Sequence, residues 1–383
     1  RKDVLPRSLF GLGPINGTSK AGFAWSSTGK ILRIGTADRK GDLASFRGVA
    51  AGSGENMPNA VLVTGAGGFI GSHLTERLVR DGHRVRVLVR YNGRDDRGHL
   101  DDLPADIQAE LEVHRGDLKD PEAVRAAVAD RAWVFHLGAL IAIPYSYQNP
   151  HDVVQTNVLG TAHVLDACRG SSALERLVLT STSEVYGTAR YVPIDEQHPL
   201  CGQSPYAATK IAADALGESY HRSFGLPVTI LRPFNTFGPR QSARAIIPTI
   251  ISQALVRPVV KLGRIDPRRD LTYVKDTAQG FVAIAACEGA VGRAVNIGRG
   301  EDISIGDLVE RIGRLLGRPI TVESETDRLR PAASEVERLL AGTALAQSLW
   351  NWKPRYSLDQ GLEETIAWIR EHIGRFRTET YTT

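Results

Sequence analysis

A glycine-rich segment, VTGAGGFIGSHL, constrains the fold of this chain more than any other feature of its sequence. Its glycines Gly65, Gly68 and Gly71 are three residues apart and join an apolar run to a segment with helical spacing. Glycine lets a backbone turn tightly and approach a pyrophosphate, and the N–H groups of Phe69 and Ile70 would then open a helix whose positive dipole end attracts an anion. Three glycines also occur in loops without a ligand. Their place between a first strand and a first helix indicates a dinucleotide site.

Strands and helices alternate after this segment. Apolar runs predict strands at 60–65, 83–90, 111–118, 132–139, 176–182 and 227–233, and helical patterns lie at 121–130, 150–169 and 204–224. This alternation is typical of an α/β fold, and we predict a Rossmann doubly wound parallel sheet. From about residue 236 the pattern loosens, with helices near 304–317 and 357–373. We therefore predict an NAD(P)-binding Rossmann domain over 57–235 and a smaller C-terminal α/β substrate lobe over 236–383.

Residues 1–56 differ from the rest of the chain in charge. They contain nine of the 47 Lys and Arg residues but four of the 43 Asp and Glu residues, so the positive net charge comes from them. Met57 is the only methionine and lies three residues before the first predicted strand. We interpret residues 1–56 as a disordered or non-native N-terminal extension, with a targeting peptide as the alternative.

The rest of the composition excludes several classes of protein. With 42% hydrophobic residues the chain can form a core, and no apolar stretch approaches the roughly 18 residues of a membrane span. The nearly neutral body gives no reason to expect nucleic-acid or membrane partners. Three widely spaced cysteines, Cys168, Cys201 and Cys287, suggest reduced thiols in the cytoplasm rather than a disulfide scaffold. No metal-ligand spacing is present.

The end of the second predicted strand bears on the choice of dinucleotide. An acid there would accept a hydrogen bond from the adenosine ribose and favour NAD. The segment VLVRYNGR instead carries Val89 and Arg90, with Arg94 nearby. Guanidinium groups suit a 2′-phosphate, so we favour NADP over NAD, unless both arginines are surface residues. Asp117 and Leu118 end the third strand and would flank the adenine.

A second motif, SPYAATK, indicates chemistry. Tyr206 and Lys210 are four residues apart and share one face of a predicted helix. An ammonium at Lys210 could therefore stabilise a phenolate at Tyr206, which could take a proton from a sugar hydroxyl while hydride passes to a nicotinamide. The segment LVLTSTSEVYG presents Thr182, Ser183 and Glu184 at the carboxyl end of a strand, where α/β sheets bind ligands.

Taken together, residues 58–375 resemble the extended short-chain dehydrogenase/reductase family, specifically its nucleotide-sugar epimerases, dehydratases and decarboxylases. The resemblance rests on the ordered motifs TGAGGFIGSHL, STSEVYG, SPYAATK, RPFNTFGPRQSARAIIPTI, RRDLTYVKDTAQGF and LWNWKPRYSLDQGLEETI. Within the family, the segments HLGALIAIPYSYQNP, LVRYNGR and RPAASEVERLLA look most similar to NDP-N-acetylglucosamine 4,6-dehydratases of the legionaminic-acid type. GDP-mannose 4,6-dehydratases come next.

This resemblance implies roles for individual side chains. Thr182 and Tyr206 would hold the sugar 4-hydroxyl, Tyr206 would remove its proton, and Lys210 would bind the nicotinamide ribose. Glu184 would take the proton from carbon 5, water would leave from carbon 6, and the hydride taken from carbon 4 would return to carbon 6. The bound NAD(P) would be recycled. Ser183 stands where dTDP-glucose dehydratases have an aspartic acid, which argues against a dTDP-glucose substrate and leaves open what protonates the leaving hydroxyl.

The resemblance also implies a site for the substrate diphosphate. Asn235 resembles a residue that contacts phosphate, Arg269 and Arg330 match positions that bind pyrophosphate or ribose, and Pro233 would lie near the nicotinamide. We expect a 4,6-dehydratase acting on an NDP-hexose, with UDP-N-acetylglucosamine as the default substrate. A UDP-glucuronate decarboxylase and an NDP-sugar 4-epimerase are the alternatives, and a non-catalytic NAD(P)-binding sensor is the alternative from another class. Relatives usually pair through two helices, so we also expect a homodimer.

Overall fold

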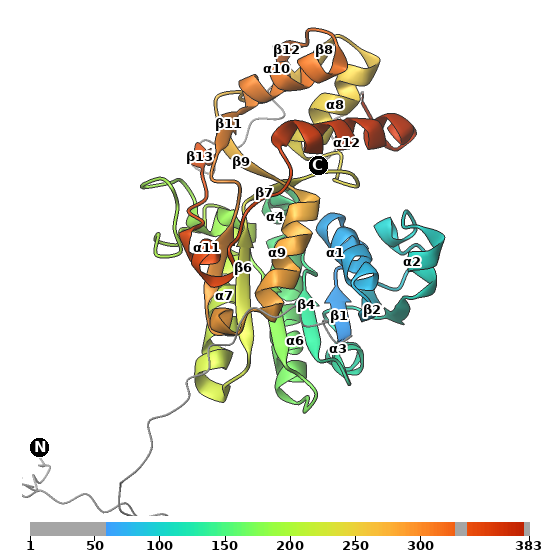
Figure 1. Ribbon diagram of the computed structural model, residues 1–383, viewed down its shortest axis with the longest axis vertical. Coiled ribbons are helices and arrows are strands. Elements are labelled where there is room, and N and C mark those ends of the chain that lie inside the picture. The colour runs from blue at the N-terminus through green and yellow to red at the C-terminus, as the bar shows by residue number, and fades with distance from the viewer. Residues whose placement is uncertain (1–58, 326–334, 379–383) are drawn as a thin grey trace, which may run out of the picture. The chain divides into compact units, whose positions relative to one another are not determined.

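A parallel sheet of seven strands forms the first part of the computed structural model, which describes residues 59–325 and 335–378 (Figure 1). The expectations for residues 1–56 and for Arg330 lie outside the described residues. Every neighbouring pair of strands is parallel, in the order β10-β6-β5-β4-β1-β2-β3. The strands are β1 (Ala60–Thr64), β2 (Arg84–Val89), β3 (Glu112–Arg115), β4 (Trp133–His136), β5 (Arg176–Thr180), β6 (Val228–Pro233) and β10 (Ala294–Ile297). The predicted α/β fold with a doubly wound parallel sheet is confirmed.

Helices cover both faces of this sheet because alternate residues of its strands point to opposite sides. In β1, Val61 and Val63 belong to one hydrophobic core, whereas Leu62 belongs to another. The first core contains residues of α1 (Phe69–Arg80), α9 (Val274–Ala286) and α11 (Ala344–Trp350). The second contains residues of α3 (Pro121–Val128) and α6 (Gly160–Arg169). The sheet thus lies between two helical layers.

The longest helix, α7 (Pro205–Phe224), begins and ends where its sequence dictates. The Ser204 side chain caps its start by accepting a hydrogen bond from the Ala207 N–H group at 3.1 Å, and Pro205 occupies the first turn. Gly225, with a φ of 68°, ends the helix in the left-handed conformation. These signals place Tyr206 and Lys210 in the first two turns of α7, beside the carboxyl end of the sheet.

The predicted helix at 150–169 is interrupted. It consists of α5 (Pro150–Val154), a π-helical turn η2 (Gln155–Leu159) and α6. The other described helices before residue 235 are short. They are α2 (Ala105–Ala109), α4 (Ile143–Gln148) and the single turns η1 (Gly98–Leu100) and η3 (Ser183–Tyr186).

A second hydrophobic part follows, built on three helices and two small sheets (Figure 1). Its helices α8 (Ile246–Val256), α10 (Ile305–Leu316) and α12 (Leu358–Glu371) bury apolar faces against one another. One of its sheets contains β7 (Asn235–Phe237), β9 (Arg268–Tyr273), β11 (Asp302–Ser304) and β13 (Arg338–Leu339). The other contains β8 (Val259–Leu262) and β12 (Thr321–Ser324). The single helical turns η4 (Glu288–Ala290) and η7 (Ile373–Arg375) follow α9 and α12.

The chain passes between these two parts more than once. Although α9 and β10 follow residue 235, both pack in the first core, and β10 pairs with β6. Residues on both sides of the expected boundary therefore build the large sheet. Within the described residues, no helix is long and apolar enough to cross a membrane.

Candidate active site

The glycine-rich segment forms a tight cradle between β1 and α1. Gly65 has a φ of +68°, and a Cβ atom there would lie 2.7 Å from the backbone nitrogen of Gly138. A Cβ atom on Gly71 would lie 2.1 Å from the carbonyl oxygen of Gly65, a separation that no side chain tolerates. Gly68 begins α1 without a side-chain cap, so the helix starts with backbone N–H groups open to a ligand. The residues present thus fit a pyrophosphate, as the sequence predicts.

A cavity of about 200 Å³ adjoins this cradle at the carboxyl ends of β1 to β4. Of the residues expected to bind a dinucleotide, Gly65, Arg90, Asp117 and Leu118 line it. The Arg90 Nε atom lies 3.4 Å from the Asp117 Oδ2 atom, and the arginine side chain is 78% exposed. Arg94 is exposed and is not among the lining residues. The sequence did not reveal the other charged lining pair, Lys119 and Asp152, which form an ion pair.

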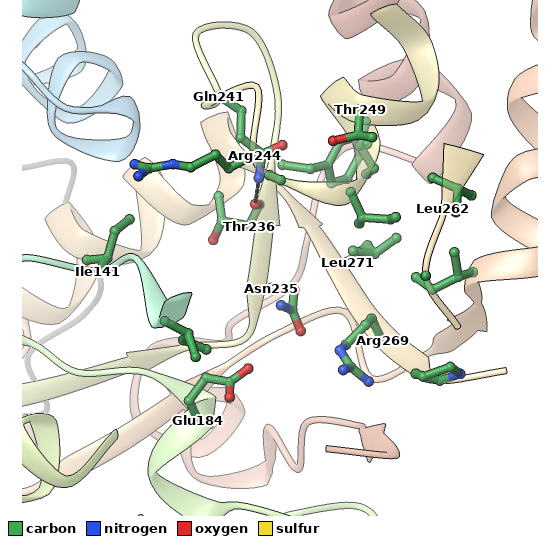
Figure 2. A pocket seen from close by; sticks show the side chains of 18 of the residues that line it. Ile141, Glu184, Asn235, Thr236, Gln241, Arg244, Thr249, Leu262, Arg269 and Leu271 are labelled. Atoms are coloured by element: carbon green, nitrogen blue, oxygen red, sulfur yellow. Dashed lines mark hydrogen bonds between the residues drawn. The ribbon is translucent and has the colours of Figure 1, made fainter. Parts of the chain in front are cut away.

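A larger cavity, of about 430 Å³, brings together predicted residues from four elements. Thr182 and Glu184 come from the turn after β5, Tyr206 from the start of α7, Asn235 from β7 and Arg269 from β9. Figure 2 shows Glu184, Asn235 and Arg269 approaching the same space from three of these elements. Residues far apart in the sequence therefore meet in one site.

The backbone of the turn η3 directs some of its side chains toward this cavity and others away from it. The Thr182 hydroxyl caps the turn by accepting a hydrogen bond from the Glu184 N–H group at 3.2 Å. Thr182 and Glu184 line the cavity, but Ser183 between them is 2% exposed and is not one of the lining residues. Ser183, which the sequence groups with Thr182 and Glu184 as a candidate catalytic residue, therefore has no access to the cavity.

The pKa of Tyr206 depends on its neighbours in the cavity, including Glu184. Burial raises the pKa of the Tyr206 phenol, and the negative charge of Glu184 raises it further, while a hydrogen bond with the Thr182 side chain lowers it. The phenol is 7% exposed and lines the cavity. A base poised here can take a proton from a hydroxyl that enters beside Glu184.

Lys210 contacts the neighbouring strand. Its Nζ atom donates a hydrogen bond to the Thr180 carbonyl oxygen at 2.5 Å, at the end of β5. Burial lowers the pKa of Lys210, and the charge of Asp214 raises it. The lysine side chain thus reaches the strand and not the phenol. The expected stabilisation of a Tyr206 phenolate by Lys210 is therefore not supported by a direct contact between the two side chains.

The diphosphate residues expected from the sequence lie on the other side of the cavity. The Oδ1 atom of Asn235 is buried and has no hydrogen-bond partner in the described part of the chain. The Nη2 atom of Arg269 lies 3.4 Å from the Glu335 Oε1 atom, and the residue is 9% exposed. A ligand group that donates, such as a hydroxyl, would satisfy the orphaned amide oxygen, whereas a diphosphate, which only accepts, would bind through the Asn235 amide N–H groups. Pro233 is buried at the end of β6 and lines neither cavity, and Arg330 is not described.

The segment after β7 adds lining residues that sequence reasoning missed. Gln241 and Arg244 face the cavity, and the Gln241 Nε2 atom donates a hydrogen bond to the Thr236 carbonyl oxygen at 2.9 Å (Figure 2). Apolar side chains complete the wall, among them Ile246, Ile247, Leu262, Leu271 and Ile305. The motif GPRQSAR was the available signal, but its spacing does not tell which of its side chains turn inward.

Arg240 anchors this segment to the cradle helix. It is a non-glycine residue with a φ of +67° and is 8% exposed. Its Nη2 atom donates hydrogen bonds to the His73 Nδ1 atom at 2.8 Å and to the Glu76 Oε2 atom at 2.9 Å, both on α1. Burial and the Arg240 charge lower the pKa of His73 to about 3, so this imidazole stays neutral and accepts the bond. The contact fixes the segment that carries Gln241 and Arg244.

In the described ranges, no group of three or more His, Cys, Asp or Glu side chains could hold a metal ion. The polar residues of the larger cavity are instead suited to hydrogen bonding and proton transfer.

Comparisons with known proteins agree on one family. The family model described as GDP-mannose 4,6 dehydratase matches residues 62–365. A protein of Bacillus subtilis named as an uncharacterised UDP-glucose epimerase, YtcB, is 32% identical over 81% of this chain and 97% of its own length. The dTDP-glucose 4,6-dehydratase of Streptomyces antibioticus is also 32% identical, over 82% of this chain and 92% of its own. The crystal structure of the dTDP-glucose 4,6-dehydratase DesIV of Streptomyces venezuelae, with NAD bound, has a TM-score of 0.74 at 27% identity and covers 83% of this chain and 99% of its own.

Proposed function

Because this chain belongs to the nucleotide-sugar dehydratase and epimerase family described by the GDP-mannose 4,6-dehydratase model, we propose that it is a nucleotide-sugar 4,6-dehydratase. It would convert an NDP-hexose, with UDP-N-acetylglucosamine as the first candidate, to the NDP-4-keto-6-deoxy-hexose and water. The observation that carries this proposal is the carboxylate of Glu184 in the same cavity as Tyr206. A 4-epimerase need not have a carboxylate base there, whereas elimination requires one.

The residues of the cavity divide the work as follows. Bound NAD(P) would supply a hydride acceptor that also returns the hydride. Tyr206, aligned by Thr182, would take the proton of the sugar 4-hydroxyl as the carbon 4 hydrogen leaves as hydride. The resulting 4-ketone acidifies the carbon 5 hydrogen, which Glu184 would take as a proton. The carbon 6 hydroxyl would leave as water with the proton that Glu184 captured, and the hydride would add to carbon 6. Carbon 5 would then regain a proton from solvent to complete the product, balancing the 4-hydroxyl proton that Tyr206 releases to solvent. Asn235 and Arg269 would hold the diphosphate.

A direct test uses the purified protein without added cofactor. It is incubated with UDP-N-acetylglucosamine and, in parallel, with GDP-hexoses, dTDP-hexoses and UDP-glucuronate, and the products are followed by mass spectrometry. We expect one sugar to lose the mass of one water with no net reduction of cofactor. Loss of carbon dioxide from UDP-glucuronate would make the protein a decarboxylase instead. No turnover of any nucleotide sugar would favour a non-catalytic sensor.

A 4-epimerase is the second candidate. The residue beside Glu184 on the turn is Ser183, a buried serine and not an acid, so the turn offers no second acid to protonate a leaving hydroxyl. The Bacillus subtilis relative is also named as an epimerase. In the same experiment, an epimerase would give a product of unchanged mass with inverted configuration at carbon 4. That result would contradict the dehydratase and the elimination role of Glu184.

For the cofactor we propose NADP, although the related Streptomyces structure holds NAD. The support is Arg90, which lines the smaller cavity where an NAD enzyme would have an acid after β2. Replacing Arg90 by Ala should weaken binding of NADPH by about tenfold, the effect of one lost charge contact, and leave NADH binding nearly unchanged. Arg94→Ala serves as the matched control, because Arg94 does not line the cavity. Fluorescence titration of both nucleotides measures the ratio, and an equal loss for NADH would refute NADP selection.

The expected homodimer and cytoplasmic location stay proposals. Exposed apolar side chains support the first on the two helical segments through which we expect pairing, 150–169 and 204–224: Val154 is 43% exposed, Leu159 50% and Phe224 53%.

A further inference from the structure

A buried ion pair lies behind the larger cavity, and neither of its members lines it. Asp214 of α7 and Arg232 of β6 are each 2% exposed. The Arg232 Nη2 and Nε atoms both lie 3.0 Å from the Asp214 Oδ2 atom. Removing two charges from water is costly, and a buried pair is often no more stabilising than apolar side chains of similar volume. The pair therefore needs an explanation other than stability.

One end of this pair is linked to Lys210 and to the strand before the catalytic turn. Asp214 follows Lys210 by four residues, so both lie on one face of α7. Lys210 donates to the Thr180 carbonyl oxygen, and the Ser181 hydroxyl donates to the Asp214 Oδ2 atom at 2.8 Å. Two residues of α7 thus form hydrogen bonds with Thr180 and Ser181, the two residues directly before Thr182.

The other end of the pair reaches the turn that carries Glu184. The Arg232 Nη1 atom donates a hydrogen bond to the Tyr186 hydroxyl at 3.0 Å, and that hydroxyl donates to the Asn296 Oδ1 atom at 2.7 Å. Tyr186 is the last residue of the turn η3 and is fully buried. A continuous chain of buried polar contacts therefore runs from the helix of Tyr206 to the turn of Glu184.

The charge of Asp214 also affects the protonation of Lys210. The groups that face Lys210 are Asp214 on its own helix and His136 on β4, whose pKa burial lowers to about 3, so that it is neutral. Asp214 in turn faces both Lys210 and Arg232. Burial raises the pKa of Asp214, while the charges of Arg232 and Lys210 lower it, so the ionised carboxylate and these two buried cations stabilise one another. Without the carboxylate, Lys210 would lose its proton more readily, and Arg232 would stand unpaired.

We propose that Asp214 is a positioning residue that keeps Lys210 protonated and, through Arg232 and Tyr186, holds the Glu184 turn against the Tyr206 helix. The functional meaning of this network rests on the proposed role of Glu184 and on the role that the sequence resemblance implies for Lys210. Its charge effect does not depend on which nucleotide sugar the protein converts.

The charge effect is tested by titrating Lys210 itself. The chain has nine lysines, so full-length protein labelled with carbon-13 lysine gives few signals, and Lys210 is assigned from their loss in Lys210→Met. In Asp214→Asn we expect the Lys210 titration to move to lower pH by about one unit or more. In the double variant Asp214→Asn with Arg232→Gln, which removes one charge of each sign, we expect it to return most of the way toward that of the unmodified protein. A purely structural pair would not be rescued in this way.

Asp166→Asn is the matched control. Asp166 also accepts a hydrogen bond from a residue of α7, the Tyr220 hydroxyl, at 2.8 Å, but at the protein surface. It should leave the Lys210 titration unchanged. The proposal is overturned if Asp214→Asn folds, by circular dichroism, and titrates like the unmodified protein, or if the double variant titrates no closer to it than Asp214→Asn.

The positional effect is tested with Tyr186→Phe, which keeps the ion pair and removes the hydroxyl between Arg232 and the turn. We expect Lys210 to titrate normally while exchange of the carbon 5 hydrogen slows by about tenfold or more, because small misplacements of a catalytic group are costly. Unchanged exchange would overturn this half of the proposal. If no nucleotide sugar reacts at all, the proposed function fails, but the Lys210 titrations still decide the charge effect.

Discussion

Replacing Glu184 by Gln is expected to stop water loss while oxidation at carbon 4 stays measurable. Glutamine keeps the size of the side chain in the cavity but cannot accept the carbon 5 proton. Tyr206 and Thr182 are unchanged, so proton removal from the 4-hydroxyl and hydride transfer should continue. Because a positioned general base contributes about 10²- to 10⁴-fold, formation of the 4-keto-6-deoxy product should fall by about 10³-fold.

Isotope labels separate the two steps of this variant. In deuterated water, exchange at carbon 5 reports on the base, and reduced nicotinamide absorbance reports on carbon 4 oxidation. Glu335→Gln is the matched control, since this carboxylate lines the same cavity but pairs with Arg269. We expect it to raise KM and to leave carbon 5 exchange intact. Normal exchange in Glu184→Gln would assign the base to another group.

Much of the fold was predictable because the alternation of apolar runs and helical patterns is strong. The six predicted strands agree with β1 to β6 at their amino ends within one residue and extend too far at several carboxyl ends. The seventh strand, β10, was missed. Its four residues AVNI are too short to show a period, and they become a strand through pairing with β6, more than sixty residues earlier in the chain. Long-range pairing of this kind leaves little local signal.

The candidate site was predictable where a motif fixes both the residue and its element. Thr182, Glu184 and Tyr206 meet in one cavity because each follows a strand end or opens a helix beside the sheet. Sequence adjacency did not tell that Ser183 would turn away from its two neighbours. The partners of Lys210 were equally hidden, since its contact with Thr180 and its proximity to Asp214 depend on how α7 packs against β5.

The second large effect is expected for Tyr206→Phe. Phenylalanine fills the same buried space, so the fold should persist, but no group remains to take the proton of the 4-hydroxyl. We expect kcat/KM to fall by about 10³-fold or more, within the range for loss of a general acid or base. Unlike Glu184→Gln, this variant should block both hydride transfer and carbon 5 exchange, because the ketone that acidifies carbon 5 never forms. Retained exchange at carbon 5 would contradict this order of steps.

The pH dependence would test the proposed role of Tyr206 as the base more sharply than the loss of rate. Burial and the Glu184 charge raise the pKa of Tyr206, so its phenol is mostly protonated at neutral pH and kcat/KM should increase as the pH rises. Thr182→Val removes the hydrogen bond that lowers this pKa, and the increase should therefore move to higher pH. In Tyr206→Phe the increase should vanish from whatever activity remains. If the residual activity of Tyr206→Phe kept the same pH dependence, the titrating base would be a different group, and the division of work between Tyr206 and Glu184 would have to be reassigned.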